Sequence, residues 1–235
     1  NNGLTTWDWN GETVPGPAPG LAESWEIDPN NPLRWIFHLR DGLKFHDGTD
    51  IDAEAVVQSS HRLFNEDHAN YSAKVAGLGN WIWSGSCCKA DAFKALDSST
   101  VELTTTEING FTPHGLASVH VVSPKALAEW PGDEFATHHS GSGPFKLVDQ
   151  TPRVSLTMER FEDYWGNKPN VDRVVLRPLP EPTTRLAALL ADEVDWIDVP
   201  PPDSIPRLRN EGFDVRIKEY PHVWPYQLNL LKPPF

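Results

Sequence analysis

The chain has 235 residues, of which 39% are hydrophobic and 23% charged, enough apolar material for one packed domain or two modest ones. Its net charge of −13 makes nucleic acid and anionic membrane surfaces poor partners. No run of 18 apolar residues occurs, so the sequence predicts no membrane-spanning helix. The first residue is Asn1 and no signal peptide is visible, so we expect a processed chain or a fragment.

The first clear elements lie between residues 33 and 63. Alternating apolar residues predict a strand from Leu33 to Arg40. Asp41-Gly42 and Asp47-Gly48 are typical of turns. Apolar residues at helical spacing then predict a helix from Asp52 to Leu63, with Asp52 as its N-cap.

Residues 66–98 follow no regular pattern and contain both cysteines of the chain, Cys87 and Cys88. Adjacent Cα atoms are only about 3.8 Å apart across a trans peptide, closer than disulfide geometry usually requires. We therefore favour two thiols in a loop, while a vicinal disulfide stays open.

Regular patterns return after this segment. The sequence predicts a strand from Thr100 to Thr105 and a short helix from Pro124 to Trp130, with proline near its start. Residues 145–148 and 154–160 then form a predicted hairpin.

The last third alternates strands with helices. Strands are predicted at residues 171–177, 194–199 and 213–217. They are separated by one helix that begins near Pro182 and by a second, short helix with Asp203 as its cap. Such an order favours a βαβ arrangement with parallel pairing. The whole pattern predicts an α/β chain.

Enzyme interpretations find little support. Gly141-Ser142-Gly143 lacks the strand–turn–helix context of a nucleophile elbow. The histidines, including the adjacent His138 and His139, show no spacing typical of a metal site. We therefore expect no enzymatic activity, no metal and no cofactor.

Several motifs occur in the order and spacing of one known family. PGLAESWE at residues 19–26, the stretch from Trp35 to Thr49 and GSGPFKL at residues 141–147 are three of them. The segment 140–203 and the C-terminal NLLKPPF at residues 229–235 extend the match. Together they resemble the peptide/nickel class, family 5, of extracellular solute-binding proteins of bacterial ABC transporters.

This resemblance implies a periplasmic-binding-protein-like fold of two lobes. The resemblance covers only the first lobe, so we expect this chain to form one lobe made of two α/β subdomains, with the second lobe absent. Residues 1–122 are expected to form its smaller, peripheral α/β subdomain. Residues 123–235 are expected to form its main α/β subdomain, which ends at a hinge strand.

The resemblance also implies a function. We expect an extracytoplasmic solute-binding component of an ABC importer that captures peptides or a similar small solute by lobe closure. Its partners would be the solute and a membrane permease, with no nucleic acid, and we expect a monomer. It would be periplasmic or extracellular, with a lipid anchor in the full-length protein as one option.

The alternative is a truncated lobe that serves as a non-transport module for protein or glycan interaction. The ligand, and the choice between a fragment and a natural short form, stay open.

The candidate ligand-binding residues follow mainly from the resemblance. Trp224, Tyr226 and Asn229 lie in the hinge strand, where relatives place cleft residues, and alternation puts Trp224 and Tyr226 on one face. Tyr71 lies near a cleft tyrosine of the family. Trp7 is a candidate because tryptophan offers a large flat contact surface. For each of them, packing in the core is the alternative.

Overall fold

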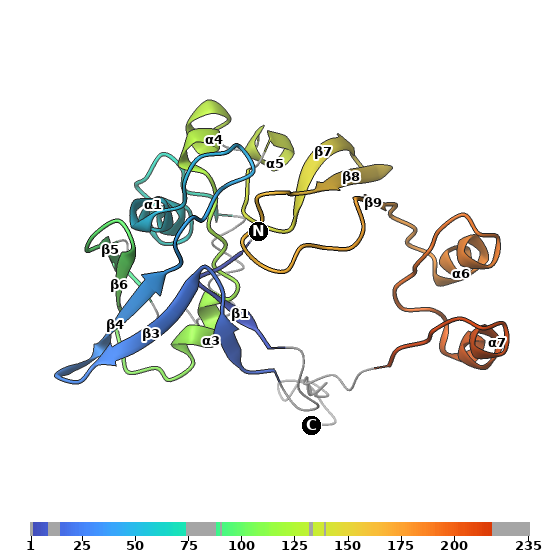
Figure 1. Ribbon diagram of the computed structural model, residues 1–235, viewed down its shortest axis with the longest axis horizontal. Helices are drawn as coiled ribbons and strands as arrows, with labels where there is room; N and C mark the ends of the chain where they lie inside the picture. Colours follow the sequence, from blue (N-terminus) through green and yellow to red (C-terminus); the bar gives the residue numbers. More distant parts are fainter. Residues whose placement is uncertain are drawn as a thin grey trace, which may run out of the picture. The chain divides into compact units, whose positions relative to one another are not determined.

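A computed structural model describes most of the chain (Figure 1). The described residues are 2–8, 15–73, 88–89, 91–131, 134–138 and 140–217. Their contacts divide the chain into two compact units, Asn1–Arg177 and Pro178–Phe235, and each is described by itself below. Among the described residues, no helix has the length and apolar character needed to span a membrane.

The first unit begins with a short antiparallel pair, β1 (Thr5–Trp7) and β2 (Pro17–Pro19). The chain then doubles back closely along β1. Leu4 O accepts hydrogen bonds from Gly20 N at 3.2 Å and from Ala22 N at 2.9 Å. This close approach fixes the start of the next strand against β1.

A four-stranded antiparallel sheet holds the core of the first unit. Its order is β3-β4-β6-β5. The strands are β3 (Ala22–Asp28), β4 (Asn31–Leu39), β5 (Phe93–Ala95) and β6 (Thr100–Thr104). The alternating residues Trp35 and Phe37 of β4 and Val101 and Leu103 of β6 are buried. The strands predicted at residues 33–40 and 100–105 are therefore confirmed.

Helix α1 (Ala53–Phe64) packs on β5 and β6 and buries its apolar side chains in the same core (Figure 1). The Asp52 side chain accepts a hydrogen bond from Ala55 N at 2.8 Å, because the first amides of a helix lack partners within it. Both the predicted helix and its predicted N-cap are confirmed.

Three short helices follow: α3 (Thr112–Leu116), α4 (Pro124–Glu129) and α5 (Phe135–His138). The Ser123 hydroxyl caps α4 by accepting from Ala126 N at 3.1 Å, and Pro124 occupies the first turn, where a missing N–H is harmless. The helix predicted at residues 124–130 is therefore confirmed.

The first unit ends with a three-stranded antiparallel sheet in the order β7-β8-β9. Strands β7 (Phe145–Thr151) and β8 (Ser155–Arg160) form the predicted hairpin. Strand β9 (Arg173–Leu176), which pairs with β8, is the strand predicted at residues 171–177. In agreement with the predicted α/β class, the described chain combines helices and sheets.

Two other predicted strands are wrong. Neither residues 194–199 nor residues 213–217 are strands, so the predicted parallel pairing is absent from the described residues. Val199 has a φ of +48°, which an extended strand does not allow. Alternation indicates a local preference only, and a strand also requires a backbone hydrogen-bonding partner.

The second unit contains α6 (Pro182–Leu190), the 3₁₀ turn η2 (Pro202–Ser204) and α7 (Ile205–Asn210). Asp203 lies inside η2 and makes no capping hydrogen bond to α7, so its predicted role as a cap is wrong. Arg185 donates hydrogen bonds to four backbone carbonyls, those of Leu179, Pro180, Asp198 and Val199. This arginine ties the two proline-rich loops of the unit together.

The cysteine interpretation also needs correction. Cys88 is disulfide-bonded, so the preference for two thiols is wrong for this residue. Cys87 lies outside the described residues.

The loop before α1 is bonded to the segment that returns after α5. His46 N donates to Gly141 O at 2.8 Å, and Asp47 N donates to the Ser140 hydroxyl at 3.1 Å. The Asp47 carboxylate in turn accepts from the Ser123 hydroxyl at 2.5 Å. These bonds join residues 76 to 95 positions apart across the predicted boundary at residue 122. The division into 1–122 and 123–235 stays a prediction.

The same carboxylate makes stability depend on pH. Burial raises the pKa of Asp47, but hydrogen bonds from Ser123, Thr49 and Ser140 outweigh it, and the net pKa is lowered. A lowered folded-state pKa contributes stability that is complete above about pH 4 and is lost as the pH falls through the folded value.

We therefore expect Asp47→Asn to lower the free energy of unfolding by about 1 kcal/mol at pH 7, because a charge-assisted hydrogen bond is lost. This difference from the wild type should shrink as the pH falls below about 5, through the lowered pKa of Asp47. Urea unfolding across that range measures it, with Asp41→Asn in the neighbouring exposed turn as the control. A difference that stays constant or grows on acidification would contradict the assignment.

Candidate functional site

The structure describes two of the five candidate binding residues. Trp7 lies at the end of β1 and is half-buried, and Tyr71 lies in the turn region after α1 and is also half-buried. Trp224, Tyr226 and Asn229 lie outside the described residues. Among the hydrogen bonds and ring contacts of the described residues, none joins Trp7 to Tyr71.

Trp7 belongs to an aromatic cluster formed by β1 and α3. The Trp7 and His114 rings meet edge to face, with centroids 5.6 Å apart. Phe111 contacts the same imidazole at 5.4 Å, again edge to face. The Thr5 hydroxyl donates to Pro113 O at 2.6 Å and so fixes β1 against α3. We call Trp7, Phe111 and His114 the aromatic cluster.

The outer edge of the aromatic cluster is open to solvent. Phe111 is 72% exposed and Ile108, in the same loop, is 73% exposed. The loop is nonetheless well ordered by hydrogen bonds. Asn109 Oδ1 accepts from Phe111 N at 2.9 Å, and the Thr112 hydroxyl donates to Asn109 O at 2.7 Å. The loop therefore presents two large apolar side chains to solvent on a defined backbone.

The chemistry of the aromatic cluster suits the binding of a flat or apolar group. Aromatic faces and edges offer contact area with little loss of side-chain entropy. Within the described residues, the buried Nδ1 of His114 has no hydrogen-bond partner. No group of three or more potential metal ligands lies together in the part of the chain that the structure describes.

Sequence reasoning missed Phe111, His114 and Ile108. The Asn109-Gly110 pair is typical of a turn and could have shown that Phe111 follows a tight loop. Exposure of an aromatic side chain has no sequence signature, because it depends on which elements cover the residue. Only the packing of α3 against β1 shows that these side chains gather beside Trp7.

Tyr71 has a separate environment. Its backbone N donates to His68 O at 2.9 Å, and Ser72 N donates to Arg62 O at 3.1 Å, so the segment lies against the end of α1. In the same region, the rings of His61 and His68 stack on each other, with centroids 4.7 Å apart. These bonds hold the backbone of Tyr71 in place.

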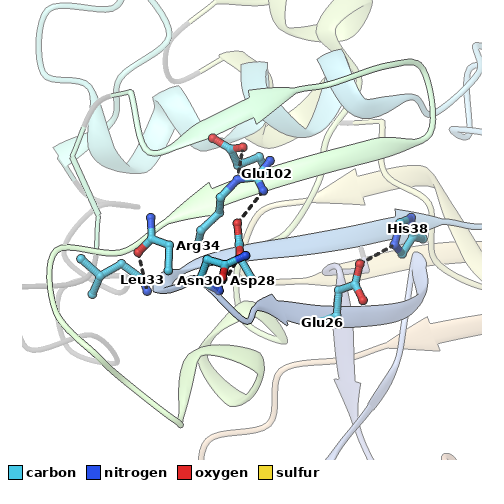
Figure 2. Close-up of polar contacts among 8 residues, drawn as sticks. Glu26, Asp28, Asn30, Leu33, Arg34, His38 and Glu102 are labelled. Atoms are coloured by element: carbon cyan, nitrogen blue, oxygen red, sulfur yellow. Dashed lines mark hydrogen bonds and ion pairs between the residues drawn. The ribbon is translucent and has the colours of Figure 1, made fainter.

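A charged network occupies the four-stranded sheet (Figure 2). Arg34 on β4 binds Asp28 at 2.9 Å and Glu102 at 2.6 Å, and His38 lies 3.8 Å from Glu26. A hydrogen bond from Asn30 N and the Arg34 guanidinium lower the pKa of Asp28. The network joins β3, β4 and β6, and its members are not part of the aromatic cluster.

Comparison with known proteins identifies the class of this chain. The family model described as bacterial extracellular solute-binding proteins, family 5 Middle, matches residues 16–235. The chain belongs to this family, and the resemblance seen in the sequence motifs is confirmed.

Individual relatives agree with the family. The chain is 32% identical to the probable D,D-dipeptide-binding periplasmic protein DdpA of Escherichia coli, over 86% of this chain and 38% of the relative. It is 29% identical to the periplasmic oligopeptide-binding protein OppA of Escherichia coli, over 99% of this chain and 44% of that protein. The chain thus spans less than half the length of these relatives, which are solute-binding proteins by name and not enzymes.

Solved structures show the same fold. The periplasmic binding protein DppA from Helicobacter pylori, in complex with the peptide STSA, matches with a TM-score of 0.77 and 24% identity, over 89% of this chain and 42% of that one. The binding protein AgaA, in complex with agropinic acid, matches with a TM-score of 0.74 and 28% identity, over 89% of this chain and 40% of that one. The predicted periplasmic-binding-protein-like fold is confirmed, and this chain covers only part of it.

Proposed function

We propose that this chain is part of an extracytoplasmic solute-binding protein of an ABC importer and that it captures peptides or a similar small solute. Membership of family 5 carries the proposal. The names of the relatives support it, since DdpA and OppA are called dipeptide- and oligopeptide-binding periplasmic proteins. The proposed partner is a membrane permease, and the proposed location is periplasmic or extracellular, with a lipid anchor in the full-length protein as one option.

The aromatic cluster is the proposed solute-contacting wall of this chain. Trp7 was a candidate from the sequence, and the structure adds Phe111 and His114 to it. Phe111 and Ile108 are both largely exposed in one loop, and exposed apolar side chains that lie together mark interaction sites. Tyr71, Trp224, Tyr226 and Asn229 stay further proposals for the same function.

Lobe closure in such proteins buries a solute between two walls, and each wall supplies only part of the affinity. We therefore expect this 235-residue chain to bind tri- and tetrapeptides weakly, in about the millimolar range.

Phe111→Ala tests the role of the aromatic cluster. We expect it to weaken peptide binding by about fivefold or more, because truncating an aromatic anchor of a binding site costs over about 1 kcal/mol. Calorimetric titration with a mixed tri- and tetrapeptide set measures the affinity. The matched control is Val154→Ala, which truncates another exposed apolar side chain, 61% exposed, in the β7–β8 turn.

Val154→Ala should leave the affinity unchanged. No saturable binding by the wild type, or equal binding by Phe111→Ala, would refute the role of the aromatic cluster.

A further inference from the structure

A hollow of about 360 Å³ lies at the β5–β6 edge of the four-stranded sheet. Its wall comes from the segment after Cys88, from β5 and from the end of β6. The lining residues are Lys89, Asp91, Ala92, Lys94, Thr104, Thr105 and Thr106. A hydrogen bond from Thr104 N to Ala92 O, at 2.9 Å, holds the two sides of the hollow together.

The hollow is positive in a strongly acidic chain. Lys89 and Lys94 supply two positive charges and Asp91 one negative charge, which leaves one net positive charge on its wall. In the described part of the chain, neither lysine forms an ion pair. The chain as a whole carries −13, so two unpaired ammonium groups on one hollow are a local exception.

The pairing of Glu102 with Arg34 explains why Lys94 forms no ion pair among the described residues. Lys94 on β5 lies directly opposite Glu102 on β6, and opposite charges at such positions normally pair. The Glu102 carboxylate is instead bound by Arg34 from the other neighbouring strand, at 2.6 Å (Figure 2). The Lys94 ammonium is therefore left available beside the hollow.

The threonines divide into two groups. The Thr105 side chain is buried and its hydroxyl lies 2.8 Å from Glu107 O and 3.2 Å from Leu33 O, so it serves the fold. Thr104 and Thr106 are exposed on the same wall and bring two further hydroxyl groups that can donate. The wall thus combines two ammonium groups with two hydroxyls.

We infer that this hollow binds a small oxyanion, a carboxylate or a phosphate. Ammonium groups and hydroxyls are the donors that such anions accept from, and lysine serves as a point charge toward either of them. The space of about 360 Å³ admits a small anion together with water. This inference is independent of the aromatic cluster and of the proposed importer function.

The test is a titration of the 235-residue chain with inorganic phosphate, acetate and citrate at low ionic strength, followed by amide NMR shifts. We expect saturable shifts at Ala92, Lys94 and Thr104. The dissociation constants should be about 1–10 mM, because water screens the attraction between the anion and two exposed ammonium groups. The phosphate and carboxylate arms show which oxyanion is preferred.

Lys94→Gln and Lys89→Gln should each weaken binding about threefold to tenfold, and the double variant should abolish it. Both side chains are exposed, so we expect the variants to fold, which circular dichroism checks. Lys146→Gln on β7 is the control, since this lysine also forms no ion pair among the described residues. Absence of saturable shifts with all three anions, or binding that survives the double substitution, would overturn the inference.

Discussion

Phe37→Ala should lower the free energy of unfolding of the first unit by about 3–5 kcal/mol, because a large buried ring is replaced by a cavity. Phe37 is fully buried at the centre of the four-stranded sheet. Its ring stacks on the rings of Trp25 and Trp35, with a centroid distance of 6.4 Å to each. The surrounding sheet is tied by strand pairing on both sides of β4, so it cannot collapse to fill the space.

Urea unfolding followed by tryptophan fluorescence measures this loss. Phe111→Ala is the matched control, since it removes the same atoms from a side chain that is 72% exposed. We expect that variant to change stability by no more than about 0.5 kcal/mol. Equal losses in the two variants would mean that Phe37 is not at the centre of the core.

Gly20→Ala should destabilise the first unit by about 3 kcal/mol, through a clash that backbone atoms cannot avoid. A Cβ at this position would lie 2.7 Å from Gly3 O, 2.8 Å from Thr5 C and 2.9 Å from Leu4 O. These atoms belong to β1 or to the residues just before it, which accept the hydrogen bonds from the turn into β3. Separating the strands to make room would break those bonds.

Gly16→Ala is the control for this prediction. A Cβ on Gly16 would meet nothing within 4 Å. Thermal unfolding of both variants distinguishes a local clash from a general cost of replacing glycine. If Gly20→Ala unfolds at the same temperature as Gly16→Ala, the close approach of β1 to the turn is wrong.

The sequence predicted those elements whose signals are local. The strand around Phe37 follows from alternation, and α1 follows from helical spacing with Asp52 as its cap. The hairpin of β7 and β8 also needs only neighbouring residues. In each case, the local preference and the tertiary partner agree.

The wrong predictions concern segments whose local pattern is not matched by a hydrogen-bonding partner elsewhere in the described chain. Residues 213–217 alternate as a strand would, and residues 194–199 are rich in apolar side chains, but the structure gives neither segment a strand partner among the described residues and puts Val199 at positive φ. Asp203 has the side chain of a cap, yet it lies within a 3₁₀ turn. Neither failure could be foreseen, because hydrogen-bond partners far along the chain are not visible in a local pattern.

The candidate site shows the same limit. Trp7 was chosen for its residue type alone, whereas its neighbours Phe111 and His114 lie more than a hundred residues away in the sequence. No pattern in the sequence predicted the hollow lined by Lys89 and Lys94 either. Its character depends on the pairing of Glu102 with Arg34 instead of Lys94, which only the sheet register and the side-chain geometry show.

The most direct test of the proposed function is the NMR signal of the Trp7 indole N–H during a tri- and tetrapeptide titration, assigned with a Trp7→Phe variant. We expect a saturable shift of this signal, together with shifts of Phe111 and His114, at about millimolar peptide. In the Phe111→Ala variant, we expect the same indole shift to need about fivefold or more peptide to reach its midpoint. A Trp7 signal that stays unchanged while peptide binds elsewhere on the chain would rule out the aromatic cluster as the solute-contacting wall.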